Sequence, residues 1–111
     1  MGEFEQLIML AILRLKDRAY GVEIRRAVAE RTGRDVASGA VYTTLGRLEA
    51  RGYVRSRIGE TVPERTGQRR KYYRIEPEGA AALHRSYKAL RAMASGVVPE
   101  LERLAMEADG G

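Results

Sequence analysis

The chain has 111 residues, enough for one domain with an appended helix. Its 44% hydrophobic and 32% charged residues exclude a disordered chain, and the absence of cysteine excludes disulfide bonds and thiolate metal sites. The net charge is +5, while residues 51–75 alone carry +6, so the positive excess lies in one middle segment. Such a segment indicates a polyanionic partner, although a solvated run of charge is the alternative.

Two helices are predicted before residue 33. Residues 3–16 are apolar on most sides, which predicts a largely buried helix that Asp17-Arg18 ends. The short apolar run follows Glu3 and Glu5 and no small-residue cleavage site follows it, so we expect a cytoplasmic protein without a signal peptide or membrane span. A second helix is predicted from Tyr20 to Arg31, before Gly33, with an inner stripe of Val22, Ile24, Ala27 and Val28.

The third predicted helix has an unusual outer face. Ser38 is a suitable N-cap and Gly52 a suitable C-terminal stop. Val41, Leu45 and Leu48 recur at helical spacing. The opposite side carries small and hydroxyl residues with one arginine, where a surface helix normally carries many charges. These residues are Gly39, Thr43, Gly46, Arg47 and Ala50.

After Gly52 the hydrophobic period changes from helical to two, which predicts a long hairpin. Residues 53–60 and 70–75 alternate in this way and are rich in β-branched and aromatic residues. The connection between them holds Pro63 and Gly67, both turn formers. The hairpin follows three helices, as the wing does in a winged helix-turn-helix.

Pro77 begins the last predicted element, since proline suits the first helical turn. Its apolar residues step by four and three, the spacing of a coiled-coil seam. Ser95, Gly96 and Pro99 interrupt that seam, so we expect a kink or restart at 95–99. The seam could cover the domain's own core, but a helix of about 45 Å exceeds one small domain and favours a second subunit. Its members include Leu83, Tyr87, Leu90, Val97, Leu101 and Leu104.

The order predicts a mainly α (α+β) winged helix-turn-helix over residues 1–76, a C-terminal dimerisation helix over 77–108 and a flexible tail over 109–111. In this fold the third helix enters the major groove, which admits only a slim face. Thr43 and Arg47 can then contact base edges, and Tyr42 and Thr44 can contact phosphates. Ser38 and Gly39 lie where free backbone N–H groups attract phosphate. An ordinary amphipathic helix is the alternative.

The hairpin tip adds arginines beside this helix. We expect Arg65, Arg69, Arg70 and Lys71 to contact phosphates or the minor groove and to supply salt-sensitive affinity. Tyr20, Tyr53 and Tyr73 have apolar neighbours and are expected in the core, whereas the sequence does not assign Tyr72 to the core or to the DNA-binding surface.

The chain resembles the PadR family of bacterial winged-helix transcriptional regulators. The resemblance is carried by YGVEI, GAVYTTLGRLE, RGYV and KYYRIEPEG in that order, and it extends to about residue 83. It implies a homodimer held by the C-terminal helix against the partner's first helix, where Phe4 and Leu7 lie. It further implies operator binding, usually repression, release by a small molecule in many members, and Gln68 as an additional wing contact.

These observations favour a dimeric regulator that binds double-stranded operator DNA, and they do not indicate an enzyme. A winged helix used as a protein-interaction module is the alternative. No catalytic residue, metal or cofactor is expected: His84 is the only histidine, and no carboxylate pair or glycine-rich phosphate loop is present.

Overall fold

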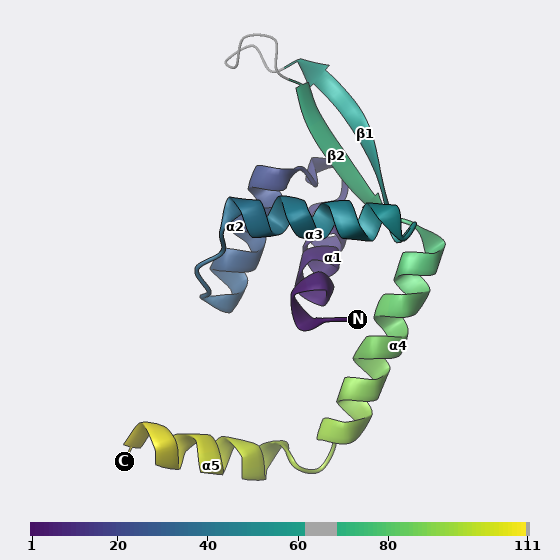
Figure 1. Ribbon diagram of the computed structural model, residues 1–111. Helices are drawn as coiled ribbons and strands as arrows, with labels where there is room; N and C mark the ends of the chain where they lie inside the picture. The colour runs from purple at the N-terminus through teal and green to yellow at the C-terminus, as the bar shows by residue number, and fades with distance from the viewer. Residues whose placement is uncertain (62–68, 111) are drawn as a thin grey trace.

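The computed structural model describes residues 1–61 and 69–110 (Figure 1). Its elements follow the predicted order. They are α1 (Glu3–Leu15), a 3-10 turn η1 (Lys16–Arg18), α2 (Gly21–Thr32), α3 (Ser38–Ala50), β1 (Val54–Thr61), β2 (Arg69–Ile75), α4 (Pro77–Ala94) and α5 (Val98–Gly110).

The core lies where α1, α2 and α3 cross beneath the base of the hairpin. Each helix contributes one apolar side, as the three- and four-residue spacing requires. The largest fully buried side chains include Ile8, Met9, Ile24, Leu45 and Leu48. Val22, predicted for the inner stripe of α2, is exposed, because Gly21, Ile24 and Val28 form the buried side of that helix.

The hairpin is antiparallel, with Val54 paired to Ile75 and Ser56 to Tyr73. The backbone N–H of Tyr73 donates to the Ala19 carbonyl at 2.8 Å, and Tyr20 forms an isolated bridge with Tyr72. These bonds attach β2 to the segment between α1 and α2. Tyr73 is buried as predicted, while Tyr20 and Tyr53 are half-buried.

The C-terminal end of α3 is fastened to the hairpin. Gly52 has φ 78°, a left-handed conformation that glycine adopts readily, and the N–H of Tyr53 donates to the Leu48 carbonyl at 2.9 Å. Glu49 then reaches both strands: it accepts a hydrogen bond from Ser56 Oγ on β1 and pairs with Lys71 Nζ on β2 at 3.6 Å. The helix and the hairpin are therefore joined by side chains as well as by the chain itself.

α4 starts against the backbone at residue 53, where Gly79 leaves no room for a Cβ beside the Tyr53 carbonyl. It descends from the hairpin base, and α5 turns back below the helical body (Figure 1). Gly96, with φ 85°, lies in the turn between the two helices. α5 buries none of its residues. It also continues through Gly110, so Asp109 and Gly110 extend the helix and do not form the predicted tail, since they follow a run of good helix formers.

Three helices followed by a two-stranded wing make this fold a winged helix-turn-helix, which confirms the predicted class.

Candidate nucleic-acid interface

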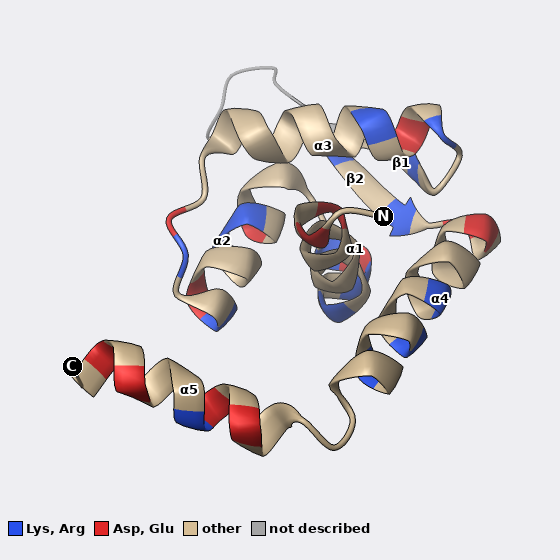
Figure 2. Cartoon of the chain, turned by 60° about the horizontal axis from the view of Figure 1, so that its bottom comes forward, with Lys and Arg blue, Asp and Glu red and all other residues tan. Residues whose placement is uncertain are grey.

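The outer face of α3 is uncharged over most of its length. Figure 2 shows no coloured segment along α3 before its C-terminal part, where Arg47 and Glu49 lie. The exposed residues of this face include Gly39, Tyr42, Thr43, Gly46 and Arg47, and the opposite side packs into the core. The predicted smooth face is therefore open to solvent.

Two glycines on this face have no role in the packing of the protein. Apart from the adjacent residues and the backbone of α3 itself, a Cβ built at Gly39 or Gly46 meets no described atom within 4 Å. Glycine inside a helix costs about 0.5–1 kcal/mol relative to alanine. Because neither position needs glycine for an intramolecular contact, the missing side chains leave space for a surface that approaches from outside.

Tyr42 stands at the edge of the face, where α3 meets the start of α2. Its ring lies where a side chain at Gly21 would be, so a Cβ at Gly21 would collide with the phenol. The tyrosine nevertheless keeps 51% of its surface exposed. The phenol therefore lies beside the first turn of α2, and the N-terminus of a helix favours anions.

Thr44 was predicted to contact phosphates, and this prediction is wrong. The residue is only 1% exposed, because it shares the core-facing side of α3 with Val41, Leu45 and Leu48. Its hydroxyl accepts a hydrogen bond from Arg47 Nη2 at 3.4 Å. Thr44 therefore touches the guanidinium of a predicted base-contacting residue, and cannot itself meet a ligand from solvent.

Ser38 was predicted as the N-cap of α3, and this is also a correction. The helix begins at Ser38 itself, Ala37 occupies the cap position, and no side chain makes a cap hydrogen bond there. Ser38 is exposed at the first turn. Since the chain supplies no side-chain acceptor, the first N–H groups of α3 keep their capacity to bind an anion.

The predicted wing contacts divide into two groups. Arg65 and Gln68 lie outside the described residues, and only the backbone of Arg69 is described. Arg70 lies with its guanidinium 4.2 Å from the centre of the Tyr20 ring. Lys71 pairs with Glu49, so it neutralises a carboxylate at the end of α3 and remains exposed.

The environment of Glu49 holds its carboxylate ionised. The hydrogen bond from Ser56 lowers the pKa of Glu49 most; burial raises this pKa by less than Ser56 lowers it, and the ammonium of Lys71 lowers it further. Arg47, Glu49 and Lys71 thus place both signs of charge at the C-terminal end of α3, next to its uncharged part.

The hairpin carries a second cluster of arginine and tyrosine side chains, which is not among the predicted site residues. Arg57 lies 4.7 Å above the Tyr72 ring, and the rings of Tyr72 and Tyr20 meet edge to face at 5.4 Å. The alternation of β1 and β2 contains the signal, because Arg55, Arg57, Tyr72 and Arg74 all fall on the strand face opposite Ser56 and Tyr73.

The predicted dimer contacts differ in their exposure. Leu83 is buried in the core of its own domain, so its assignment to a subunit interface is wrong: the first turns of α4 cover the domain itself. Phe4 and Leu7 are half-buried against the same core. The exposed members are Tyr87, Leu90, Val97, Leu101 and Leu104.

Within residues 1–61 and 69–110, no helix is long and apolar enough to cross a membrane. The same part of the chain holds no group of three side chains suited to bind a metal ion.

The smooth α3, the hairpin beside it and the three-helix body define a winged-helix protein of the kind found among transcriptional regulators. Residues 9–85 match the transcriptional regulator PadR-like family, and the chain belongs to that family. The predicted family is thereby confirmed. No curated protein sequence matches the chain significantly.

Solved structures show the same relationship. A PadR family transcription regulator from Clostridium difficile R20291 is 28% identical, with a TM-score of 0.68, over 88% of this chain and 98% of that one. A transcriptional regulator from Clostridium thermocellum is 26% identical, with a TM-score of 0.69, over 84% and 87% of the two chains. A regulator from Thermoplasma acidophilum is 25% identical, with a TM-score of 0.70, over 90% and 91%.

Proposed function

We propose that this protein binds double-stranded DNA in a sequence-specific manner and represses transcription as a homodimer on a palindromic operator. The observation that carries the proposal is the exposed, slim face of α3, whose Gly39 and Gly46 serve no packing contact. A major groove about 12 Å wide admits a helix whose entering side chains are small. Thr43 and Arg47 are the exposed side chains on that face with hydrogen-bonding capacity for base edges.

Phosphate contacts would come from both sides of α3. At one end lie the exposed Ser38, the uncapped N–H groups of the first turn and the phenol of Tyr42. At the other lies the hairpin, where Arg69, Arg70 and Lys71 belong to β2. Because such contacts are electrostatic, they would supply affinity that is independent of sequence and falls with salt.

Dimerisation is supported by α5, which buries no residue against the described part of its own chain. It has 13 residues and buries none of them. An isolated helix of this length is marginal in water, so its stability requires a partner. Leu101 and Leu104 are exposed on it, and Tyr87 and Leu90 are exposed on α4. A second copy that covers this stripe would both stabilise α5 and bury the exposed leucines.

The test combines two measurements on the purified chain. Selection from random duplexes at two salt concentrations should enrich a twofold-symmetric site, with half-sites about one helical turn, 34–36 Å, apart. Sedimentation at micromolar concentration should show a dimer. A selected site without twofold symmetry, or a monomer in sedimentation, would contradict the dimer. No salt-dependent duplex binding at all would favour a protein-interaction module and contradict the proposal as a whole.

A further inference from the structure

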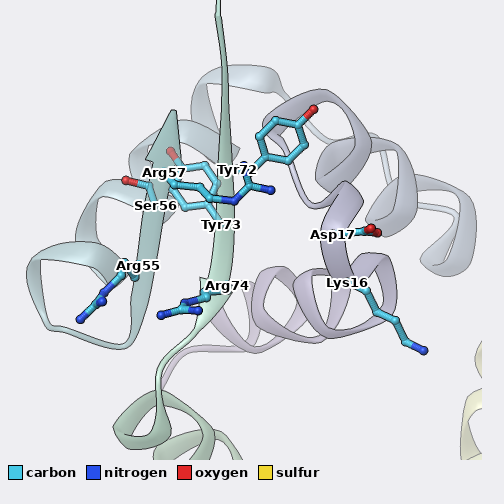
Figure 3. A pocket seen from close by; sticks show the side chains of 8 residues that line it. All are labelled: Lys16, Asp17, Arg55, Ser56, Arg57, Tyr72, Tyr73 and Arg74. Atoms are coloured by element: carbon cyan, nitrogen blue, oxygen red, sulfur yellow. The ribbon is translucent and has the colours of Figure 1, made fainter. Parts of the chain in front are cut away.

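A hollow on the reverse side of the wing lies apart from the α3 face. It has a volume of about 400 Å³ and lies between η1 and the strands β1 and β2 (Figure 3). Its basic lining comes from Lys16 on η1 and from Arg55, Arg57 and Arg74 on the hairpin. These three arginines fall on the strand face opposite Ser56 and Lys71, the two residues that Glu49 of α3 contacts. A ligand in this hollow would therefore contact the hairpin without occupying the face of α3.

The positive charge in this hollow is incompletely balanced. Arg55 and Arg74 stand directly opposite each other in the strand register, an arrangement of like charges that destabilises a sheet. Both approach the same atom, Glu76 Oε1, at 3.0 and 3.9 Å. That oxygen is buried and makes no hydrogen bond to any described residue. The guanidinium N–H groups of both arginines consequently keep capacity for another acceptor.

Arg57 adds a third cation. Its guanidinium stacks on the Tyr72 ring, and no carboxylate pairs with it in the described part of the chain. Asp17 is the acidic side chain that η1 contributes to the lining, and in Figure 3 it lies across the hollow from the hairpin arginines. Because η1 also contributes Lys16, its wall carries one charge of each sign, and the excess charge around the hollow is positive.

The backbone at the rim is strained. Lys16 has φ 54° and ψ −117°, and it is the one residue other than glycine with a positive φ among those described. L-residues rarely adopt this conformation, and such strain is concentrated at ligand sites and switch regions. Here it occurs in the residue that directs the chain from α1 into the wall of the hollow.

From these observations we propose that the hollow binds a small organic oxyanion, a carboxylate or a phosphate. Arg57 and Arg74 would hold the anionic group, and Asp17 would accept a hydrogen bond from the remainder of the ligand. The volume is that of a metabolite-sized site, and guanidinium groups bind carboxylate and phosphate oxygens in pairs. The position behind the wing favours a free small molecule over a phosphate of duplex DNA.

Inorganic phosphate is the probe, added to the ¹⁵N-labelled full-length chain at constant ionic strength set with chloride. We expect saturating shifts of the backbone amides of residues 16–17, 55–57 and 72–74. Arg57→Gln should weaken phosphate binding about tenfold or more, and Asp17→Asn should tighten it because a negative charge is removed. Arg18→Gln is the matched control: it removes one charge from the same turn, does not line the hollow, and should leave binding unchanged.

Three results would overturn the proposal. Non-saturating shifts spread over all basic segments would show charge screening only. An equal loss in Arg18→Gln and Arg57→Gln would show a long-range effect of net charge. If a random-sequence duplex shifted the same amides and phosphate competed with it, the anion would be a DNA phosphate. Since phosphate binding is measured without DNA, its failure is independent of the proposed function.

Discussion

The phenol of Tyr42 on α3 rests in the space that the missing side chain of Gly21 leaves at the start of α2. This contact sets the position of a side chain that we assign to phosphate binding. We therefore expect Gly21→Ala to push Tyr42 outward with little loss of stability, because an exposed tyrosine can turn away. The affinity of Gly21→Ala for duplex DNA should fall at least as far as that of Tyr42→Phe, which lacks only the hydroxyl.

Gly79→Ala is the contrasting variant, because the added Cβ would meet the backbone of Tyr53 and not a mobile side chain. Overpacking of this kind costs about 1–3 kcal/mol, and more where the obstacle is backbone. Urea unfolding of both variants, together with duplex titrations, separates the two effects. A large stability loss in Gly21→Ala would show that the Tyr42 ring cannot move.

Gly46→Ala should increase stability while it weakens DNA binding. The new methyl group meets no described atom beyond its neighbours and the backbone of α3, and alanine favours the helix by about 0.5–1 kcal/mol. In the groove, however, it would occupy space that the DNA needs. Denaturation curves and duplex titrations measure the two quantities on the same sample. A more stable variant with unchanged affinity would show that DNA does not approach this glycine.

Arg47→Ala should relax the sequence preference, with a loss of about 1–3 kcal/mol confined to one base position of the selected site. The matched control is Thr44→Val, which removes the hydroxyl that Arg47 contacts while the residue stays buried. Thr44→Val should keep the same preference for DNA sequence, because the 3.4 Å contact between the Thr44 hydroxyl and Arg47 is too weak to orient the guanidinium. A uniform loss across all duplexes in Arg47→Ala would assign the arginine to phosphates instead.

The stability of the α3–hairpin junction should depend on pH through Glu49. Its pKa is lowered in the folded protein, first by Ser56 and then by Lys71, from an unfolded value of 4.5. The stabilisation is therefore present above that value and is lost as the pH falls through the lower folded pKa. Ser56→Ala should reduce this acid-dependent loss, as measured by urea unfolding across the acidic range. If the free energy of unfolding depended on pH identically in the unmodified protein and in Ser56→Ala, Ser56 would not be the main cause of the lowered pKa of Glu49.

Leu101→Glu should dissociate the proposed dimer and unfold α5, because Leu101 is 63% exposed and no described residue of the chain covers this helix. Sedimentation and helix content by circular dichroism report the two effects. The control is Glu102→Gln on the same helix, which removes one negative charge and leaves Leu101 and Leu104 unchanged. Dimers that persist in Leu101→Glu would place the subunit interface elsewhere.

The sequence predicts the order of the elements and the smooth face of α3, since both follow from local periodicity and residue size. Thr44 is misplaced because its hydroxyl suggests a polar contact. Its helical spacing from Val41 and Leu48 instead places it on the buried side of α3. The helix α3 begins one residue earlier than predicted, so that Ala37 and not Ser38 occupies the N-cap position, and helix ends are commonly displaced by one or two residues.

Other features depend on contacts between distant segments. The fit of Tyr42 to Gly21 joins two helices, and neither helix alone predicts it. The shared carboxylate of Glu76 between Arg55 and Arg74 depends on strand register. The positive φ of Lys16 arises where the end of α1 must meet β2, which no local pattern of residues specifies.

The ties from Glu49 to Ser56 and Lys71 have one more consequence. Because Glu49 contacts a residue on each strand, these contacts favour one spacing between α3 and the strands of the wing. A-form duplexes have a deep, narrow major groove that would require a different spacing. Double-stranded RNA should therefore be rejected on shape alone, before any base is read.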